Sequence, residues 1–174
     1  MRQSVAQCAL FMVAFFCMVA AALANVTIDP PAGWKSVDFP SSSQVTYQGA
    51  WGEPSPAGDY RQNINLVKTT LPADVTLDAY VDLNMKQLKQ LDSTILFTLN
   101  ERSKCGADTM QHVKYLMTVD NGSGQKHLAL EQLWVLDGAT FYAGTYARLA
   151  TQAEVPAASQ ALMTLCSHLA AAAN

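Results

Sequence analysis

Alternating apolar and polar positions over residues 62–100 predict a strand, a helix and a second strand, in that order. Residues 62–68 alternate aliphatic and polar side chains, as a half-buried strand does. Between 77 and 91 the apolar residues recur about every 3.6 positions, which is typical of a helix that lies on a sheet. Thr76 is suited to cap the start of that helix, and the alternation returns over 94–100. We therefore expect the helix to cover one face of a sheet.

The rest of the chain predicts an antiparallel sheet followed by one more helix. Short β-prone runs indicate further strands at 26–29, 37–39, 44–50, 110–119, 126–136 and 139–147. Asp137 and Gly138 form a two-residue hairpin signal, because a type I′ turn needs positive φ at both central positions. Residues 51–59 and 101–108 are polar or rich in proline and glycine, so we expect loops there. Residues 156–169 begin with a proline and predict the last helix. The pattern is that of an α+β domain.

Two hairpins determine the expected register of the C-terminal strands. We expect Leu136 to pair with Ala139 in one hairpin, and Val119 to pair with Lys126 in the other. The core face then carries Val113, Tyr115, Met117, Leu128, Leu130, Trp134 and Phe141. The opposite face carries Leu116, Leu133, Val135, Tyr142, Tyr146, His112, Lys114, His127 and Glu131. Because this second face is too apolar to be bare, we expect a helix or the N-terminal strands to cover part of it.

The first residues predict a secretory signal peptide over 1–24. Arg2 is the only charged residue before an unbroken apolar run that ends in a small-x-small pattern. We therefore expect cleavage between Ala24 and Asn25, and one domain over 25–174. The alternative is an uncleaved membrane anchor, since the run is at the low end of the length that spans a bilayer.

The charge distribution argues against several classes of partner. The formal charge of the whole chain is −3, and the loss of Arg2 with the signal peptide makes it −4. A nucleic-acid footprint needs a cluster of Lys and Arg, which this sequence lacks. We expect no nucleic-acid partner and no membrane span after cleavage of the signal peptide.

Two cysteines, Cys105 and Cys166, remain in the mature chain. An even number of cysteines in an oxidising compartment favours a structural disulfide. A redox or metal pair is the alternative, but the two residues are too far apart for a CxxC motif, and two thiolates do not complete a zinc site. We expect a disulfide, and closing so long a loop should stabilise the fold by about 4 kcal/mol.

Candidate chemistry is confined to the second face of the C-terminal strands. The expected register brings Lys114 opposite Glu131, with His127, Tyr142 and Tyr146 on the same face. These five residues form a candidate binding site, and the alternative is a solvated sheet face with one cross-strand ion pair. The sequence contains no P-loop, G-x-G-x-x-G, G-x-S-x-G or H-E-x-x-H motif. We expect no catalytic residue, no metal site and no cofactor.

Three motifs and the order of the elements point to a family. They are P-x-G-W at 31–34, N-I-N-L-V-K at 63–68 and T-L-D-A-Y-V at 76–81, followed by a strand meander and a final helix. This order is similar to that of the PsbP-like superfamily, which includes extrinsic photosystem PsbP proteins, periplasmic DcrB-type proteins and Ran-binding nuclear relatives. The resemblance covers about residues 26–169 and shares no catalytic motif.

The resemblance implies an α/β/α sandwich with a central antiparallel sheet of about six to seven strands and two main flanking helices. It also implies a non-enzymatic binding or assembly module, although no metal-binding or docking residue carries over to this chain. The leading hypothesis is a secreted, periplasmic or extracellular domain that contacts a protein partner and is a monomer or weak oligomer. One alternative is a small-molecule or lipid carrier, and another is a weak hydrolase-like enzyme that uses His127 and Glu131. Fold analogy alone does not choose among these functions.

Overall fold

The computed structural model describes residues 26–39, 46–55, 60–106, 108–120 and 124–172, which form one seven-stranded sheet and two helices. The strands are β1 (Lys35–Ser36), β2 (Thr46–Gly52), β3 (Asn63–Thr70), β4 (Leu96–Cys105), β5 (Asp108–Asp120), β6 (Gln125–Asp137) and β7 (Thr140–Leu149). The helices are α1 (Leu77–Leu91) and α2 (Pro156–Ala172).

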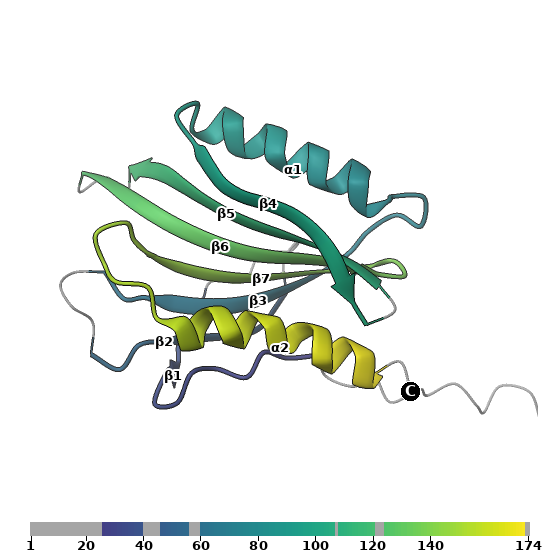
Figure 1. Cartoon of the computed structure of the whole chain (residues 1–174), viewed down its shortest axis with the longest axis horizontal. Helices are drawn as coiled ribbons and strands as arrows, with labels where there is room; N and C mark the ends of the chain where they lie inside the picture. The colour runs from purple at the N-terminus through teal and green to yellow at the C-terminus, as the bar shows by residue number, and fades with distance from the viewer. Residues whose placement is uncertain (1–25, 40–45, 56–59, 107, 121–123, 173–174) are drawn as a thin grey trace, which may run out of the picture.

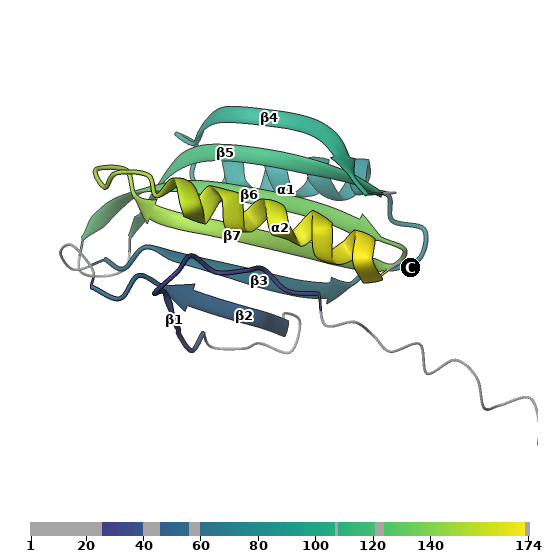
Figure 2. The same ribbon diagram turned by 60° about the horizontal axis from the view of Figure 1, so that its bottom comes forward.

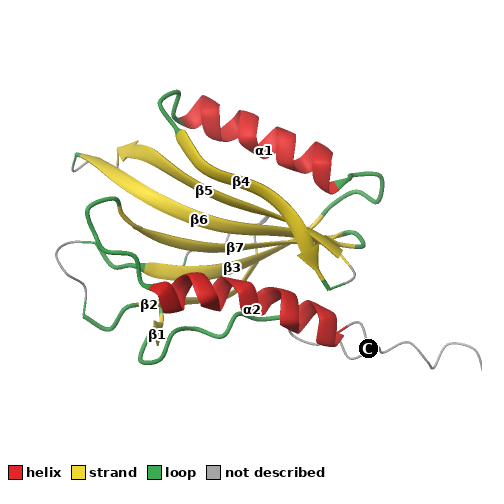
Figure 3. Cartoon of the chain, in the orientation of Figure 1, coloured by secondary structure: helices red, strands yellow, loops and turns green. Residues whose placement is uncertain are grey.

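The sheet has the order β1-β2-β3-β7-β6-β5-β4, and every neighbouring pair is antiparallel. The C-terminal strands β4 to β7 form a meander, and the pairing of β3 with β7 joins it to the N-terminal strands. The two helices lie on opposite sides of the sheet (Figures 1 and 3). The structure therefore agrees with the predicted α+β sandwich and its two flanking helices.

The larger part of the core lies between α2 and the sheet. The buried residues of α2 recur at helical spacing and are Ala158, Ala161, Leu162, Leu165 and Leu169. They share one cluster with the sheet residues Ile64, Leu66, Leu133, Val135, Tyr142 and Tyr146. Burying a leucine or isoleucine in this way stabilises the fold by about 1.5–3 kcal/mol per side chain. The second face, for which the sequence predicted only partial cover, is thus covered by a helix and holds more of the core than the face predicted to be the core face.

The other face is covered by α1, which is less deeply buried than α2. Val81 is the one residue of this helix that is buried, and it packs in a cluster with Trp134 of the sheet. The ring of Tyr80 lies 4.2 Å from that of Phe141, measured between centroids. Leu91, at the end of the predicted apolar stripe, is 77% exposed. The sequence pattern predicted the correct helix but overstated how much of it is buried.

Thr76 caps α1 as predicted, because its Oγ1 accepts a hydrogen bond from the Ala79 N–H at 3.2 Å. We expect Thr76→Ala to lower the free energy of unfolding by about 1 kcal/mol, since one N–H of the first turn loses its partner. Urea unfolding followed by circular dichroism measures this change. Thr151→Ala, at an exposed threonine outside the helices, is the matched control and should leave stability unchanged. Equal stability of Thr76→Ala and the wild type would contradict the capping role.

The predicted disulfide joins Cys105 at the end of β4 to Cys166 in α2. The two Cα atoms are 4.9 Å apart, a separation that a disulfide spans without backbone movement. Cys105 is buried, and the sulfur of Met110 lies 3.4 Å from that of Cys166. The bond ties α2 to the edge strand of the sheet.

The hairpin between β6 and β7 has a register different from the predicted one. Asp137 pairs with Thr140. Gly138 and Ala139 therefore make the turn, and Leu136 does not pair with Ala139. Gly138 has a φ of 56°, which glycine adopts without steric cost. Because the shift is two residues, every side chain keeps the face that the sequence predicted for it.

Three other predicted elements differ from the structure. The strand expected at 37–39 is wrong, because the first strand is β1 at Lys35–Ser36 and the residues after it are irregular. Residues 26–29 do not form a strand, although Val26 and Ile28 are buried in the same cluster as the leucines of α2. The expected loop at 101–108 is also wrong, because β4 continues to Cys105. That part of β4 is exposed on both faces, so its sequence lacks the apolar alternation by which a strand is recognised.

Some of the sequence predictions fall outside the described residues. These are the signal peptide over 1–24 and its cleavage site between Ala24 and Asn25. In the part of the chain that the structure describes, no helix is both long and apolar enough to cross a membrane.

Candidate functional site

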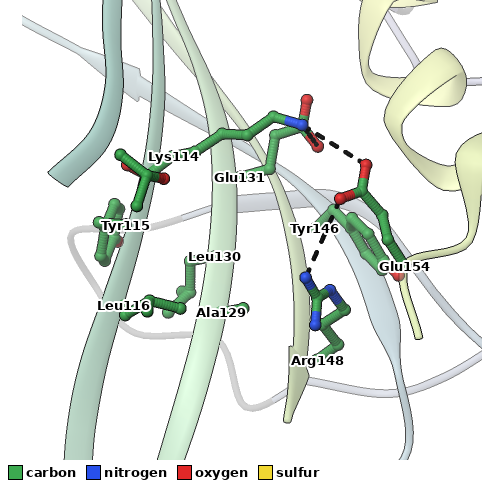
Figure 4. Close-up of a pocket in the computed structure, with 10 residues that line it drawn as sticks. Lys114, Tyr115, Leu116, Ala129, Leu130, Glu131, Tyr146, Arg148 and Glu154 are labelled. Carbon is green, nitrogen blue, oxygen red and sulfur yellow. Dashed lines mark hydrogen bonds and ion pairs between the residues drawn. The ribbon is translucent and has the colours of Figure 1, made fainter. Parts of the chain in front are cut away.

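On the face of the sheet that α2 covers, side chains of β5, β6 and β7 lie side by side in rows that run across the strands. Lys114 of β5 pairs with Glu131 of β6, as predicted, and Glu131 pairs with Tyr146 of β7. Alternate residues of a strand face opposite sides, so the next row on this face is Leu116, Ala129 and Arg148. These two rows line a hollow of about 220 Å³ (Figure 4).

Glu131 is a buried carboxylate, with 5% of its surface exposed. Its Oε1 lies 2.8 Å from His112 Nε2, and its Oε2 lies 3.1 Å from Lys114 Nζ. The hydroxyl of Ser159 in α2 donates to Oε2 at 2.5 Å. Burial raises the pKa of Glu131, but the hydrogen bonds from His112, Ser159 and Lys114 outweigh it and hold the pKa below its ordinary value. Glu131 is therefore ionised at neutral pH.

A second carboxylate, that of Glu154, borders the hollow from the connection between β7 and α2. One of its oxygens lies 3.5 Å from Lys114 Nζ and the other 3.9 Å from Arg148 Nη2 (Figure 4). Charged N–H···O hydrogen bonds are usually about 2.7–2.9 Å long, so both contacts are loose. The side chain of Glu154 is 44% exposed, and ion pairs of this kind stabilise a fold by about 1 kcal/mol or less.

Tyr146 connects this site to the neighbouring polar core. Its hydroxyl donates to Gln62 Oε1 at 2.5 Å and accepts from the Val155 N–H at 3.0 Å. The amide of Gln62 also donates to the Ala153 carbonyl at 3.4 Å. Burial raises the pKa of Tyr146, although the Val155 N–H and the charge of Arg148 oppose that rise, so the phenol stays neutral. These hydrogen bonds hold the connection to α2 beside the hollow.

A second hollow, of about 490 Å³, lies beside the first near the start of β4. The linings of the two hollows share Leu116. Leu96 also lines the second hollow, and it is 57% exposed. This region is open because α2 lies over β6 and β7 (Figure 2) and reaches β4 and β5 only near Cys105 and Met110, so the start of β4 and the end of β5 stay uncovered on that side. The result is an apolar surface that continues from the charged hollow.

Three of the five candidate binding residues lie together in the structure. Lys114, Glu131 and Tyr146 line the first hollow. His127 is four positions from Glu131 along β6; it lines the second hollow, and its Nδ1 lies 3.1 Å from Thr118 Oγ1. Tyr142 is buried in the core cluster of α2, with Lys68 Nζ 5.9 Å from its ring centroid. The structure thus does not bring His127 or Tyr142 to the other three.

Sequence reasoning missed four members of this site. They are His112, Arg148, Glu154 and Ser159. Arg148 was recoverable, because it follows Tyr146 by two residues and must share its face. Glu154 and Ser159 belong to the connection to α2 and to α2 itself, and no strand periodicity indicates where those segments lie.

The geometry is that of a satisfied polar cluster beside an open hollow. Among the described residues, no group of three or more His, Cys, Asp or Glu side chains is arranged to hold a metal ion. Likewise, each buried side-chain nitrogen or oxygen of the described part has a hydrogen-bond partner. Lys114 and Arg148 share Glu154 loosely, and this pair of cations is the part of the site best suited to meet another anion.

Comparisons with known proteins give a likeness of fold. No protein-family model matches the chain, and no curated protein matches its sequence. A solved structure of PA94, a protein of unknown function from Pseudomonas aeruginosa, is similar with a TM-score of 0.51 and 10% identity. The match covers 67% of this chain and 83% of that one, and at this identity it shows the fold alone.

A second solved structure is that of LpqN, which is involved in cell envelope biogenesis of Mycobacterium tuberculosis. It has a TM-score of 0.49 and 18% identity, and the match covers 83% of this chain and 79% of that one. Because the TM-score is below 0.5, this likeness carries no argument about family or function.

Proposed function

We propose that the chain is an exported, PsbP-like domain without catalytic activity that acts by binding a protein partner along the edge of its sheet at β4. The sandwich architecture and the order of the elements support the PsbP-like assignment. The signal-peptide pattern and the disulfide support export. One observation carries the binding surface: β4 is the last strand of the sheet, and exposed leucines stand beside it.

The outer edge of β4 offers backbone groups to a partner. β5 pairs with one side of β4, and no described strand pairs with its other side. Free N–H and C=O groups on such an edge can accept an additional strand from another chain. The second half of β4 carries Glu101, Arg102 and Lys104, and such charges discourage unspecific pairing. A partner strand therefore fits best against the first half.

Two exposed leucines lie at the start of β4 and shortly before it in the chain. Leu91 ends α1 and is 77% exposed, and Leu96 begins β4 and is 57% exposed. A tight turn joins them, in which the Ile95 N–H donates to the Asp92 carbonyl at 3.2 Å. The two leucines thus offer exposed apolar surface at both ends of this turn, which a partner chain can bury.

The state of Glu131 supports a function without catalysis. A general acid or base must reach its substrate, but this carboxylate is buried and already meets His112, Lys114 and Ser159. His127, its partner in the hydrolase hypothesis, contacts Thr118 instead. The buried carboxylate has the environment of a group that holds α2 on the sheet.

Photo-crosslinking tests the proposed edge. A benzophenone amino acid in place of Leu96 is expected to crosslink the exported chain to one discrete protein in cells of the source organism. The same group in place of Leu83, an exposed leucine of α1, is the matched control and should give no such product. A second variant, Leu91→Ser with Leu96→Ser, should weaken the complex about tenfold or more if the two leucines act as anchors. Equal crosslinking from both positions, or undiminished binding by the double variant, would contradict the proposal.

A further inference from the structure

The two hollows form one continuous trough on the α2 side of the sheet. We define this trough by the cations Lys114 and Arg148 at one end, by Leu116 and Ala129 in the middle, and by Leu96 at the other end. Leu116, Ala129 and Arg148 follow one another across β5, β6 and β7. The methyl group of Ala129 is the smallest of the three side chains, so the sheet is indented between Leu116 and Arg148. Figure 4 shows these residues bordering the hollow together with Lys114.

The charged end of the trough has two cations with a weakly held counter-ion. Lys114 keeps a close contact with buried Glu131, at 3.1 Å. Glu154 lies 3.5 Å from Lys114 and 3.9 Å from Arg148, and its side chain is half exposed. The Ser159 hydroxyl lies 3.0 Å from Glu154 but has a single proton, which goes to Glu131 at the shorter distance of 2.5 Å. The Glu154 carboxylate can therefore leave this position without uncovering a buried charge.

The other end of the trough exposes two leucines, and its one carboxylate, that of Asp92, is held by backbone hydrogen bonds. Leu96 and Leu116 pair across β4 and β5 and are 57% and 39% exposed. Asp92 at the rim already accepts hydrogen bonds from the N–H groups of Thr94 and Thr118. An apolar chain that covers the two leucines would remove their surface from water, which stabilises a complex in proportion to the area buried.

We propose that this trough binds an amphiphile with one carboxylate and an unbranched apolar chain, the carboxylate lying between Lys114 and Arg148 in place of that of Glu154. Charge complementarity selects an anionic head, because two cations remain when Glu154 turns to solvent. Glu131 stays nearby and repels further negative charge, so a single carboxylate fits better than a dianionic phosphate. The apolar chain lies over Ala129 and Leu116 toward Leu96. This site shares Leu96 with the proposed protein-binding edge, but its charged end at Lys114 and Arg148 and its middle at Ala129 lie on β5, β6 and β7 and do not depend on the proposed protein partner.

Titration with decanoate tests the proposal. Below the micelle-forming concentration, decanoate is expected to shift the amide signals of the trough residues in a saturable way by NMR. Acetate has the same head without the chain, and decyltrimethylammonium has the same chain with the opposite charge. We expect neither of them to saturate these signals at the same concentration. Saturation by decyltrimethylammonium with equal affinity would overturn the proposal, because it would show adsorption to the leucines alone.

Three variants and a control locate the site. Ala129→Phe fills the indentation and should weaken decanoate binding about tenfold or more, because the apolar chain no longer fits. Arg148→Gln should weaken it by a similar factor, because the carboxylate loses a charged hydrogen-bond donor. Glu154→Gln removes the competing carboxylate and should strengthen binding about threefold, as expected from a loose surface ion pair. Leu83→Ala changes an exposed leucine of α1 and should leave the affinity as it is.

These variants also separate a binding defect from a folding defect. Arg148 donates to the carbonyls of Leu149 and Gln152, so Arg148→Gln can disturb the connection to α2. Ala129→Phe and Glu154→Gln touch neither bond, and circular dichroism of each variant checks its fold. An unchanged affinity for decanoate in both of these folded variants would overturn the assignment.

The crosslinking experiment separates this proposal from the proposed protein-binding edge. A benzophenone at position 96 is expected to give the same crosslink in Ala129→Phe, so failure of the trough proposal is distinguishable from failure of the edge proposal.

Discussion

Glu131→Gln is expected to lower the free energy of unfolding by about 3 kcal/mol at pH 7, because it removes one partner of a buried charge cluster. Glutamine preserves the size of the side chain but leaves Lys114 without its closest anion, and only one of its two terminal atoms can still accept a hydrogen bond. It also places an amide where the Ser159 hydroxyl donates to a carboxylate. Urea unfolding at pH 7 measures the loss.

Glu154→Gln is the matched control for this prediction. It removes the second carboxylate near Lys114, but its side chain is half exposed and its ion pairs are long. Stability should therefore change by about 0.5 kcal/mol or less. Equal losses in the two variants would contradict the distinction between a buried structural carboxylate and a loosely held one.

The pH dependence of stability should identify the same carboxylate. The pKa of Glu131 is lower in the folded protein than its ordinary value of 4.5, so its ionisation stabilises the fold above that value. This contribution is lost as the pH falls through the folded pKa. The stability difference between wild type and Glu131→Gln should therefore shrink as the pH is lowered below 4.5. Asp92 also has a lowered pKa, through hydrogen bonds from Thr118 and Thr94, but it is present in both proteins and cancels in the difference. A difference that stays constant down to the acid transition would contradict the assignment.

Cys105→Ala with Cys166→Ala is expected to lower the free energy of unfolding by about 4 kcal/mol on the chain-entropy model. The bond joins residues separated by 61 positions, and its loss restores the freedom of that long segment in the unfolded chain. Alanine is preferable to serine, because Cys105 is buried and a hydroxyl there would need a hydrogen-bond partner. Thermal unfolding under identical buffer conditions measures the loss.

The end of α2 should respond most strongly to this change. Cys166 is close to Leu169, which is buried in the main core, and the disulfide ties this last part of α2 to β4. We expect faster hydrogen exchange over the last turns of α2 and little change in β6 or β7. Chemical reduction of the wild-type protein is the control, since it breaks the bond and keeps both sulfur atoms. A loss of less than about 1 kcal/mol in both experiments would show that packing alone holds the helix.

The sequence predicted the elements with strong periodicity and failed where burial is partial or the chain is polar. α1 and α2 were recognised because their apolar residues recur at helical spacing. The second half of β4 was missed because an edge strand exposed on both faces carries polar residues throughout. The register between β6 and β7 was wrong by two residues, since a dipeptide such as Asp137-Gly138 marks a turn without stating which residue ends the strand.

The candidate site was predictable only where it depends on local strand pairing. Val119 pairs with Lys126 as predicted, and that register brings Lys114 opposite Glu131. His127 and Tyr142 were included because they share a face with these residues, but sharing a face does not imply contact. Each lies four positions along its strand from Glu131 or Tyr146, a distance of about 13 Å at the rise of a strand.

The sequence by itself determined both helices, the strands with clear alternation, the face of the meander that each side chain takes, and which two cysteines pair. The elements and faces follow from periodicity and from hairpins, in which the interacting residues are close along the chain. The cysteine pairing follows because only two cysteines remain after the predicted signal peptide. Only the tertiary structure decided that β3 pairs with β7, that β4 is an edge, and that Ser159 and Glu154 meet the row of Lys114 and Glu131. Those contacts join segments far apart in the sequence, and their energies depend on how all the elements pack together.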